Sequence, residues 1–362
     1  MTADDPSTRA GRKDDHVRLA AQQRTEPPRR TEFDDVEFLH HALAGTDGGA
    51  VDLAVDVAGW RWNTPFYVNG MTGGTDITTR INRQLAIAAR ETGLPMACGS
   101  VSIALDDPAA AVGFRVIREE NPDGFVMANL GAGRGGDDAR RAVELLGADA
   151  LQLHLNAVQE TVMPEGSRDF SGWERSVESI VAASPVPVIV KEVGFGLSRR
   201  TLTRLAELGV RVADVSGTGG TDFMRIENSR RPGQDYAFLS GFGQSALACL
   251  LDAPADGPVL LASGGVRNPL DVVKALALGA RAVGVAGVFL QAALADGADT
   301  LVPLIRGWLD QTAALCALLG VTEPAGLTST DVLVRGRLGE FCMLRGVDAP
   351  ALSQRSRTRR KP

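Results

Sequence analysis

The sequence lacks the features that identify several classes of protein. It has four cysteines, with no C-x-x-C pair and no spacing typical of zinc ligands. Its longest weakly polar stretch, residues 282–295, contains glycine and is too short to span a bilayer. The N-terminus has no apolar core of the kind found in signal peptides. We therefore expect a soluble cytoplasmic protein with buried, reduced thiols and no membrane partner.

The chain as a whole also has no excess of positive charge. The formal net charge is −6 at pH 7, which argues against nucleic acid as a partner. Two segments run against that sign: the first 30 residues are rich in arginine, and the chain ends in RSRTRRKP. We expect residues 1–50 to form a flexible basic arm and lead-in segment, and residues 346–362 to form a disordered basic tail. A role in phosphate binding would also explain the basic residues of the N-terminal arm.

From residue 51 onward the sequence has a regular rhythm of short apolar runs. After a strand or hairpin at 51–60, eight runs follow at 66–69, 95–97, 124–128, 150–155, 187–190, 210–215, 258–262 and 282–286. The segments between them have helical spacing and capping residues, such as Ser198, and Asn268 before Pro269. Eight such repeats predict an α/β fold of the (β/α)8 barrel class over residues 51–345, C-terminal helices included. An open doubly wound sheet is the structural alternative.

Polar residues and glycines follow all eight predicted strands. They are Gly70–Gly74, Gly99 and Ser100, Asn129, His154–Glu160, Lys191 and Glu192, Ser216–Thr221, Ser263–Arg267, and Ala286 and Gly287. The carboxyl ends of the strands share one rim in a parallel barrel, and the loops there carry the chemistry. Eight such ends together predict a ligand site on that rim.

The end of the fourth predicted strand has the layout of an active site. The buried run ALQLH leads directly into Gln159 and Glu160. Glu160 can hold Mg²⁺ if a substrate phosphate supplies further ligands, and Arg12 and Lys13 can supply charge to that phosphate. His154 is as readily explained by a hydrogen-bonded core residue as by a catalytic one.

A phosphorylated, flat, aromatic cofactor fits the other strand ends. Glycines after the seventh and eighth strands leave backbone N–H groups open to a phosphate, and the SGTGGT segment adds hydroxyls. Lys191 ends a very apolar strand, where a lone buried charge is costly. It can form a Schiff base, pair with Glu192 or face an electron-rich ring. FMN is the leading candidate, with Lys191 beside the N1–C2 edge of the flavin.

Taken in order, the motifs resemble those of the type 2 isopentenyl diphosphate isomerases. The resemblance covers residues 11–344 and rests on RKDDH, FDDVEFLHHAL, MTGG, HLNAVQE, PEGSRDF, VKEVGFGLS, SGTGGTDF and ASGGVRNPLDVVKALALGA. Each motif is weak alone, but the series is specific. It implies a homotetramer or homooctamer that interconverts isopentenyl and dimethylallyl diphosphate in isoprenoid biosynthesis, with no net redox change.

The resemblance also implies cofactors and residue roles. The cofactors are reduced FMN, NADPH or NADH as its reductant, and Mg²⁺ bound by Glu160. The implied substrate contacts are Arg12, Lys13 and Gln159, and the catalytic candidates are Gln159, His154 and Lys191. The implied flavin contacts are Gly70, Met71, Thr72, Ser100, Asn129, Lys191, Ser216, Thr221, Gly265, Val266, Arg267, Ala286 and Gly287. No rim side chain is an obvious acid for an alkene, so we hypothesise that reduced flavin carries the protons.

Two departures from the family pattern and three alternatives stand beside this interpretation. No arginine follows Ser100, and FGQSA at 242–246 replaces an expected WGIPT-like segment. An FMN-dependent 2-hydroxyacid oxidase needs a histidine where Thr218 stands, and an inosine monophosphate dehydrogenase needs a cysteine in the sixth or seventh loop. A non-catalytic flavin-binding barrel would not need a diphosphate site.

Overall fold

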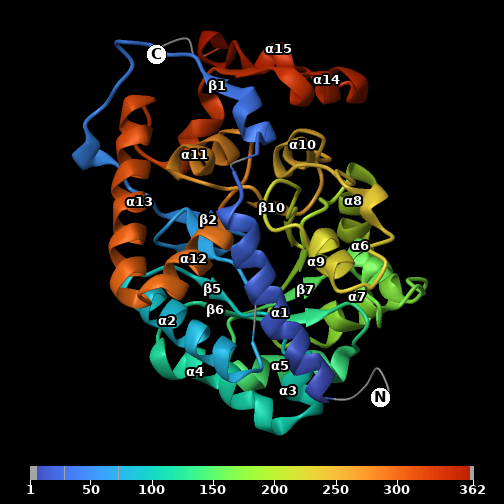
Figure 1. Cartoon of the computed structure of the whole chain (residues 1–362). Helices are drawn as coiled ribbons and strands as arrows, with labels where there is room; N and C mark the ends of the chain where they lie inside the picture. Colours follow the sequence, from blue (N-terminus) through green and yellow to red (C-terminus); the bar gives the residue numbers. More distant parts are fainter. Residues whose placement is uncertain (1–5, 28, 72, 359–362) are drawn as a thin grey trace.

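The structure is a computed structural model that describes residues 6–27, 29–71 and 73–358. Its centre is a closed barrel of eight parallel strands (Figure 1). The strands are β4 (Phe66–Val68), β5 (Met96–Ala97), β6 (Val126–Gly131), β7 (Ala150–His154), β8 (Val188–Lys191), β9 (Val212–Asp214), β10 (Val259–Ser263) and β11 (Val283–Val285). They follow chain order around the barrel, and β11 pairs with β4 to close it. The predicted (β/α)8 fold is confirmed, and each predicted apolar run overlaps one strand.

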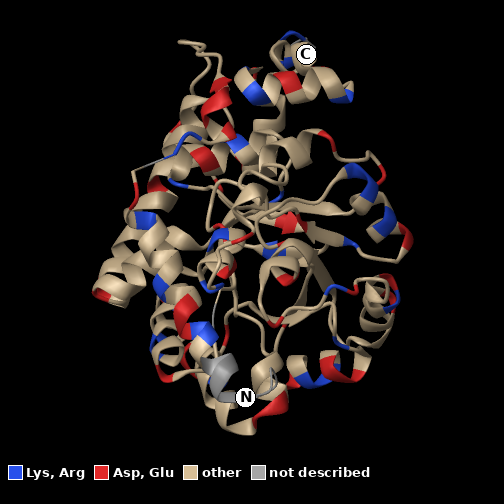
Figure 2. Cartoon of the chain, turned by 45° about the vertical axis from the view of Figure 1, so that its right-hand side comes forward, with Lys and Arg blue, Asp and Glu red and all other residues tan. Residues whose placement is uncertain are grey.

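Helices cover the outside of the barrel. They are α2 (Asp76–Thr92), α4 (Val112–Glu120), α5 (Gly136–Leu146), α7 (Trp173–Ala183), α8 (Arg199–Glu207), α10 (Ala246–Leu251), α11 (Pro269–Ala277) and α13 (Ala298–Leu318). Because α13 packs against both α2 and α11, it closes the ring of helices. Figure 2 shows acidic and basic residues interspersed over these helices. No helix in the described ranges is long and apolar enough to cross a membrane.

Short elements fill the loops at the carboxyl ends of the strands. They are α3 (Ser102–Asp106), η3 (Pro108–Ala111), α6 (Ala157–Val162), α9 (Phe223–Ser229), η4 (Ala237–Leu239) and α12 (Gly287–Ala295). They place loop side chains over the open end of the barrel, where barrel proteins bind ligands.

The predicted helix caps are present. The Asn268 side chain accepts a hydrogen bond from the Asp271 N–H at 3.0 Å, and Pro269 takes the first position of α11. The Ser198 hydroxyl accepts one from the Thr201 N–H at 3.3 Å at the start of α8. Each cap satisfies an N–H group that has no partner within its own helix, which explains why these helices begin where they do.

The amino-terminal end of the barrel is closed by an apolar plug. The segment predicted as a strand or hairpin is a hairpin of β2 (Val55–Val57) and β3 (Trp60–Trp62). Trp62 is buried, and its ring centroid lies 5.6 Å from that of Tyr67 inside the barrel. The barrel therefore opens at the carboxyl ends of its strands.

The N-terminal segment differs from its prediction. The sequence predicts a flexible arm, whereas the structure has a helix, α1 (Pro6–Thr25), that lies across the open end of the barrel (Figure 1). Val17 and Ala20 bury their side chains against the core. Such a polar helix has too few apolar residues to show a clear helical period, so its pattern resembles that of a flexible segment.

The two terminal regions meet beside the barrel. Their elements are η1 (Glu32–Asp35), β1 (Val36–Phe38), η2 (Gly48–Ala50), η5 (Pro324–Ser329), β12 (Val332–Val334), α14 (Gly336–Arg345), α15 (Ala349–Leu352) and η6 (Arg355–Thr358). β1 pairs antiparallel with β12. The segment predicted as a disordered tail is thus folded as far as residue 358. The Asp331 carboxylate holds it by accepting hydrogen bonds from the Ser356 N–H at 2.7 Å and hydroxyl at 2.6 Å.

Candidate active site

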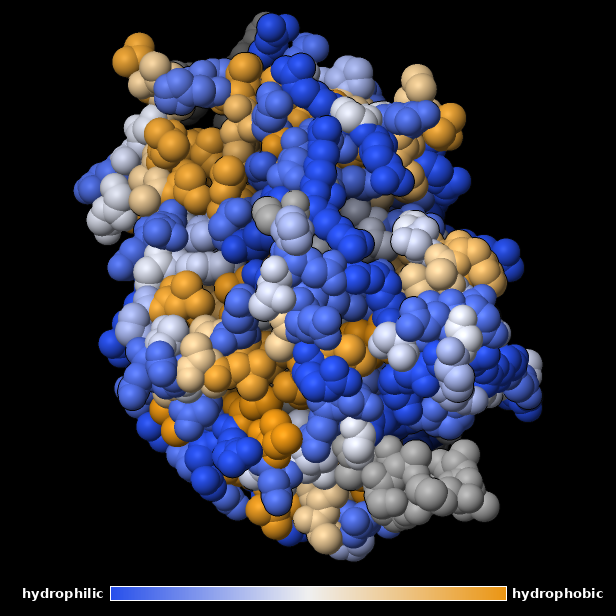
Figure 3. Space-filling view, in the orientation of Figure 1, coloured by the Kyte–Doolittle hydropathy of each residue, from blue (hydrophilic) through white to orange (hydrophobic). Residues whose placement is uncertain are grey.

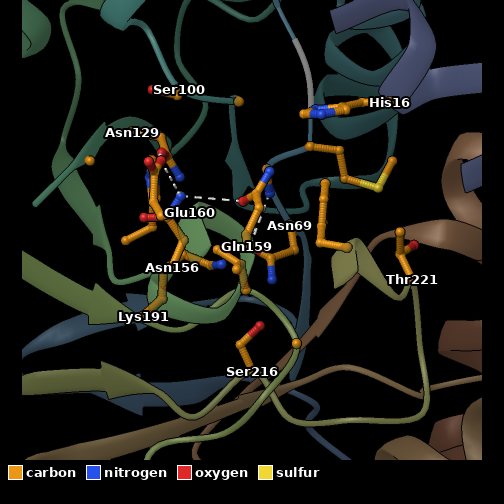
Figure 4. Close-up of a pocket in the computed structure, with 18 of the residues that line it drawn as sticks. His16, Asn69, Ser100, Asn129, Asn156, Gln159, Glu160, Lys191, Ser216 and Thr221 are labelled. Atoms are coloured by element: carbon orange, nitrogen blue, oxygen red, sulfur yellow. Dashed lines mark hydrogen bonds between the residues drawn. The ribbon is translucent and has the colours of Figure 1, made fainter. Parts of the chain in front are cut away.

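The carboxyl ends of the strands open into a cavity of about 770 Å³ that α1 borders on one side. Figure 4 shows side chains from several strands and from α1 around it. The predicted residues that line it are Arg12, Lys13, Gly70, Met71, Ser100, Asn129, His154, Gln159, Glu160, Lys191, Ser216, Thr221, Gly265, Val266, Ala286 and Gly287. The structure therefore brings the predicted cofactor and substrate residues into one cavity.

Two predicted flavin residues are not among those that line the cavity. Thr72 lies outside the described residues. The Arg267 guanidinium forms ion pairs with Asp34 at 2.6 Å and with Asp271 at 2.8 Å. These two carboxylates raise the pKa of Arg267 and tie η1 to α11. These ion pairs give the Arg267 side chain a structural role, and its flavin contact stays a prediction.

A chain of hydrogen bonds crosses the barrel beneath the cavity. His154 Nδ1 lies 2.8 Å from Asn129 Oδ1, and the Asn129 amide donates to Gln152 Oε1 at 3.1 Å. Gln152 in turn donates to Asn69 Oδ1 at 3.3 Å. Because a carbonyl oxygen only accepts, His154 donates from Nδ1 and keeps Nε2 as its second nitrogen. Burial lowers the pKa of His154 to about 3, helped by the charge of Lys191, so the ring is neutral at pH 7.

Asp214 anchors the other end of this network, and the sequence analysis missed it. The carboxylate is fully buried and accepts hydrogen bonds from the Tyr67 hydroxyl (2.8 Å), the Asn69 amide (3.1 Å), the Ser263 hydroxyl (2.8 Å) and the Ser216 N–H (3.0 Å). These four donors compensate the cost of burying the charge. The sequence does offer a sign of it, because an aspartate interrupts the apolar run VADV.

Lys191 is the buried cation of the site. It ends β8 with 4% of its surface exposed, and its ammonium donates to the Glu192 carbonyl oxygen. Burial lowers the pKa of Lys191, and the charges of Asp214 and Glu192 oppose that shift. The Glu192 carboxylate instead accepts the N–H groups of Val193 and Phe195. Within the described ranges no carboxylate lies at ion-pair distance from Lys191, so its charge is available to a ligand.

The turns after β9 and β10 approach each other so closely that they require glycine. Gly264 has a φ of 91°, and a Cβ there would lie 2.0 Å from the carbonyl oxygen of Gly217. A Cβ at Gly220 would lie 2.8 Å from the Gly265 nitrogen. With no side chains in the way, backbone N–H groups stay accessible from the cavity, as a phosphate site requires.

A second polar cluster joins α1 to α9 around Glu227, which the sequence analysis did not single out. The buried Glu227 carboxylate lies 2.8 Å from His16 Nε2 and accepts hydrogen bonds from Gln159 at 2.8 Å and Arg230 at 2.6 Å. Burial alone would raise the pKa of Glu227, but these donors lower it to about 2. Burial lowers the pKa of His16, which is therefore a neutral donor. Glu227 thus fixes the Gln159 amide.

The predicted substrate cations lie beside this cluster. Arg12 is 3.3 Å from Glu165, which also pairs with Arg230 at 2.8 Å. Among the described residues Lys13 has no hydrogen-bond partner, and burial together with the charge of Arg12 lowers its pKa to about 8. Arg12 and Arg230 therefore share the carboxylates of Glu165 and Glu227, and Lys13 adds a third positive charge. The excess of positive charge suits an anionic substrate.

Glu160, the predicted magnesium ligand, lies next to Gln159 on α6. Its carboxylate accepts hydrogen bonds from the Asn156 amide at 3.1 Å and the Ser167 N–H at 2.9 Å. Over the ranges that the structure describes, no three His, Cys, Asp or Glu side chains are close enough to hold a metal ion. A magnesium ion at Glu160 would therefore need phosphate oxygens and water as its other ligands, which is a common arrangement.

Comparisons with known proteins place the fold and the site in a class. Residues 137–334 match the family model described as FMN-dependent dehydrogenase. The fold is similar to that of a flavocytochrome b2 with sulfite bound, with a TM-score of 0.63 at 22% identity over 87% of this chain and 78% of the other. A mandelate oxidase gives a TM-score of 0.61 at 22% identity over 89% and 92%. This is a β/α barrel of the FMN-dependent class.

Full-length relatives narrow the class. The chain is 58% identical to an isopentenyl-diphosphate delta-isomerase of Nocardia farcinica over 96% of both chains. It is 57% identical to one from a Streptomyces species over 96% of both, and 44% identical to one from Lacticaseibacillus paracasei over 94% and 98%. The chain belongs to the isopentenyl-diphosphate delta-isomerase family, as its motifs predict, and is an enzyme of the isomerase class.

Proposed function

We propose that the chain interconverts isopentenyl and dimethylallyl diphosphate, using reduced FMN, NADPH as the reductant of FMN, and Mg²⁺. One observation carries this proposal: a single cavity has a glycine-lined rim with a buried lysine in one part and an excess of cations in another. Such a cavity suits a phosphorylated cofactor and a separate anionic substrate together. The names of the full-length relatives support the choice of substrate.

The residues present fit FMN. Lys191 would face the electron-rich edge of the flavin, where its charge favours the anionic reduced form. The backbone N–H groups of the glycines after β9 and β10 would donate hydrogen bonds to the phosphate. When bound, reduced FMN supplies an acid–base group for proton transfer to and from an alkene. His154 is neutral and hydrogen-bonded to Asn129, so we assign it a positioning role in place of the catalytic role that the resemblance implies.

The substrate diphosphate would lie beside Arg12 and Lys13, with Mg²⁺ on Glu160. These contacts lie away from the reacting carbons, so they supply binding energy that holds the alkene in place. Gln159, fixed by Glu227, would contact the substrate. The helix α1 borders the cavity on this side and helps to exclude water from it.

An anaerobic assay tests this proposal. Purified protein receives FMN, NADPH, Mg²⁺ and labelled isopentenyl diphosphate, and acid-labile dimethylallyl diphosphate is measured. We expect product only when all three additions are present. A protein that binds FMN and accepts electrons from NADPH, yet forms no product, would contradict the proposed reaction and leave the cofactor standing.

Oxidation of a 2-hydroxy acid is less well supported. Thr218 stands where the base of that chemistry is expected, and its backbone forms a bridge with Ser245. The histidines that line the cavity within the described ranges are His16 and His154, which are hydrogen-bonded to Glu227 and Asn129. We expect no reduction of bound FMN by lactate or mandelate, measured anaerobically by the flavin absorbance.

We further infer a cytoplasmic homo-oligomer, a tetramer or octamer. The four cysteines are free and buried, as expected of a reducing compartment. Apolar residues gather between α11 and α13 on the face shown in Figure 3, and Leu43 and Leu318 are exposed. Exposed apolar patches often mark interfaces. Light scattering coupled to gel filtration tests this, and a monomer at micromolar concentration would contradict it.

A further inference from the structure

Arg24 is a cation in the cavity to which neither the sequence analysis nor the proposed function assigns a role. It lies in the last turn of α1 and lines the cavity near the end of β11. A Cβ added to Gly287 would lie 3.3 Å from Arg24 Cδ and 3.8 Å from both Arg24 Nε and Thr221 Oγ1. The Arg24 side chain therefore crosses directly over the start of α12, beside a threonine hydroxyl.

The guanidinium of Arg24 has no hydrogen-bond or ion-pair partner among the residues that the structure describes. Arg24 Nε is buried and makes no hydrogen bond, and among the described residues no carboxylate pairs with the guanidinium. Burial lowers the pKa of Arg24, with no neighbouring carboxylate to oppose the shift. A partly buried cation without a counter-charge is unfavourable, so its position calls for an anion from outside the chain.

The neighbours of Arg24 on α1 hold it in this place. The Gln23 side chain exchanges two hydrogen bonds with the Asp222 backbone, at 2.9 and 3.0 Å. Glu26 forms a bidentate ion pair with Arg225 at 2.6 and 3.1 Å. These pairs fasten the end of α1 to the segment that follows Thr221. Arg24 lies between two fastened residues, so it is positioned before any ligand arrives.

The opposite wall offers hydrogen-bond donors of the kind that phosphate requires. Helix α12 begins at Gly287, and Ala286 before it has no side chain that can cap the first N–H groups. Gly265 and Val266, after β10, line the same cavity. Backbone N–H groups at a helix start and in a glycine turn bind phosphate well, and an arginine adds charge and a second pair of donors.

We propose that Arg24 binds the phosphate group of FMN and completes the cradle formed by Gly265, Gly287 and Thr221. The assignment rests on the proposed function, in which FMN is the cofactor. Arg24 and Arg12 are 12 positions apart on α1, which corresponds to about 18 Å along the helix axis. That separation is too large for one small anion, so Arg12 serves the substrate diphosphate and Arg24 the cofactor.

Titration of the apoprotein with FMN and with riboflavin, which lacks the phosphate, tests the proposal. Quenching of flavin fluorescence gives both dissociation constants. Arg24→Gln should weaken FMN binding about tenfold or more and leave riboflavin binding within about twofold, because a charged hydrogen bond is lost only to the phosphate. Arg24→Lys should restore part of the FMN affinity. Arg18→Gln is the matched control, since Arg18 lies on the same helix, is exposed and pairs with Asp15.

Other results of these titrations would overturn either the role of Arg24 or the proposed function. If wild type binds FMN and Arg24→Gln binds it equally well, Arg24 is not the ligand. Equal weakening of FMN and riboflavin would show a packing role and overturn the proposal. Weaker isopentenyl diphosphate binding with unchanged FMN binding would reassign Arg24 to the substrate. Failure of the wild type to bind FMN would instead overturn the proposed function. The melting temperature of apo Arg24→Gln should equal or exceed that of the wild type.

Discussion

Lys191 is a buried ammonium held by a backbone carbonyl and not by a carboxylate. Because no carboxylate among the described residues forms an ion pair with it, its charge should stabilise the anionic form of reduced flavin. We predict that Lys191→Gln lowers the flavin reduction potential and cuts isomerase turnover about tenfold or more. Anaerobic reductive titration measures the first effect and the labelled-substrate assay the second. Lys191→Arg keeps the charge and should retain more of the potential, whereas full turnover by Lys191→Ala would show that the charge has no such role.

Lys13 gives substrate binding a pH dependence. Its pKa is about 8 in the ligand-free protein, so the ammonium loses its proton as the pH rises through 8. A diphosphate ester is already fully charged there, because its last proton leaves near pH 6. Affinity for isopentenyl diphosphate should therefore fall above pH 8, at most about tenfold per pH unit. Calorimetry at pH 7 to 10 measures it. Lys13→Arg should remove the fall, and an unchanged slope in that variant would exclude Lys13.

His154 lowers the stability of the folded protein at acidic pH. Its pKa is about 6.5 in an unfolded chain and about 3 in the folded protein. Between these values the unfolded state binds a proton that the folded state does not, so the free energy of unfolding decreases as the pH falls from 6.5 towards 3. We predict that His154→Gln reduces this loss, by about 1.4 kcal/mol per pH unit at most. Urea unfolding at pH 7 and 4.5 measures it, and the exposed His40→Gln should change nothing.

At the scale of elements, the glycine turn after β10 is the most demanding feature. Gly264→Ala would place a methyl group against the Gly217 carbonyl at a positive φ. We predict a loss of about 3 kcal/mol or more in the free energy of unfolding, together with weaker FMN binding. At Gly307, within α13, an added methyl group would have none of the described residues within 4 Å. Gly307→Ala should therefore stabilise the protein by about 0.5–1 kcal/mol. Thermal melts of both variants provide the comparison.

Elements that depend on local pattern can be predicted from the sequence. The barrel strands are short apolar runs, and α11 begins where Asn268 and Pro269 predict it to begin. The rim residues follow from the strands, since parallel strands share one carboxyl end. Most of the candidate cavity is therefore predictable from the order of the amino acids alone.

Elements that depend on distant polar contacts cannot be predicted in this way. Helix α1 is held by pairs such as His16 with Glu227 and Glu26 with Arg225, whose members are about 200 positions apart in the chain. Neither partner shows its role in a local pattern. Asp214 has the same difficulty, because its four donors come from other strands or from the turn that follows. Asp214 and Glu227 cannot be predicted from the sequence for this reason.

For the molecule as a whole, α1 contributes to substrate binding but little to the folding of the barrel. Few of its side chains are buried in the core, whereas several face the cavity. We predict that deletion of residues 1–25 leaves a folded barrel that binds isopentenyl diphosphate at least about tenfold more weakly. Far-UV circular dichroism checks the fold and calorimetry the affinity. Deletion of residues 1–10 retains Arg12 and Lys13 and is the control. Wild-type affinity in the longer deletion would contradict the role of α1.

The pairing of β1 with β12 sets an order of events during synthesis. Val36 leaves the ribosome about 300 residues before its partner Val334. Contacts between such distant segments form late, because the chain must first bring its ends together. The helix that borders the cavity lies just before β1, so it is joined to a strand that pairs only after residue 334 has been made. A nascent chain can thus have its eight barrel strands paired while β1 still lacks its partner, and the β1–β12 pair is added afterwards.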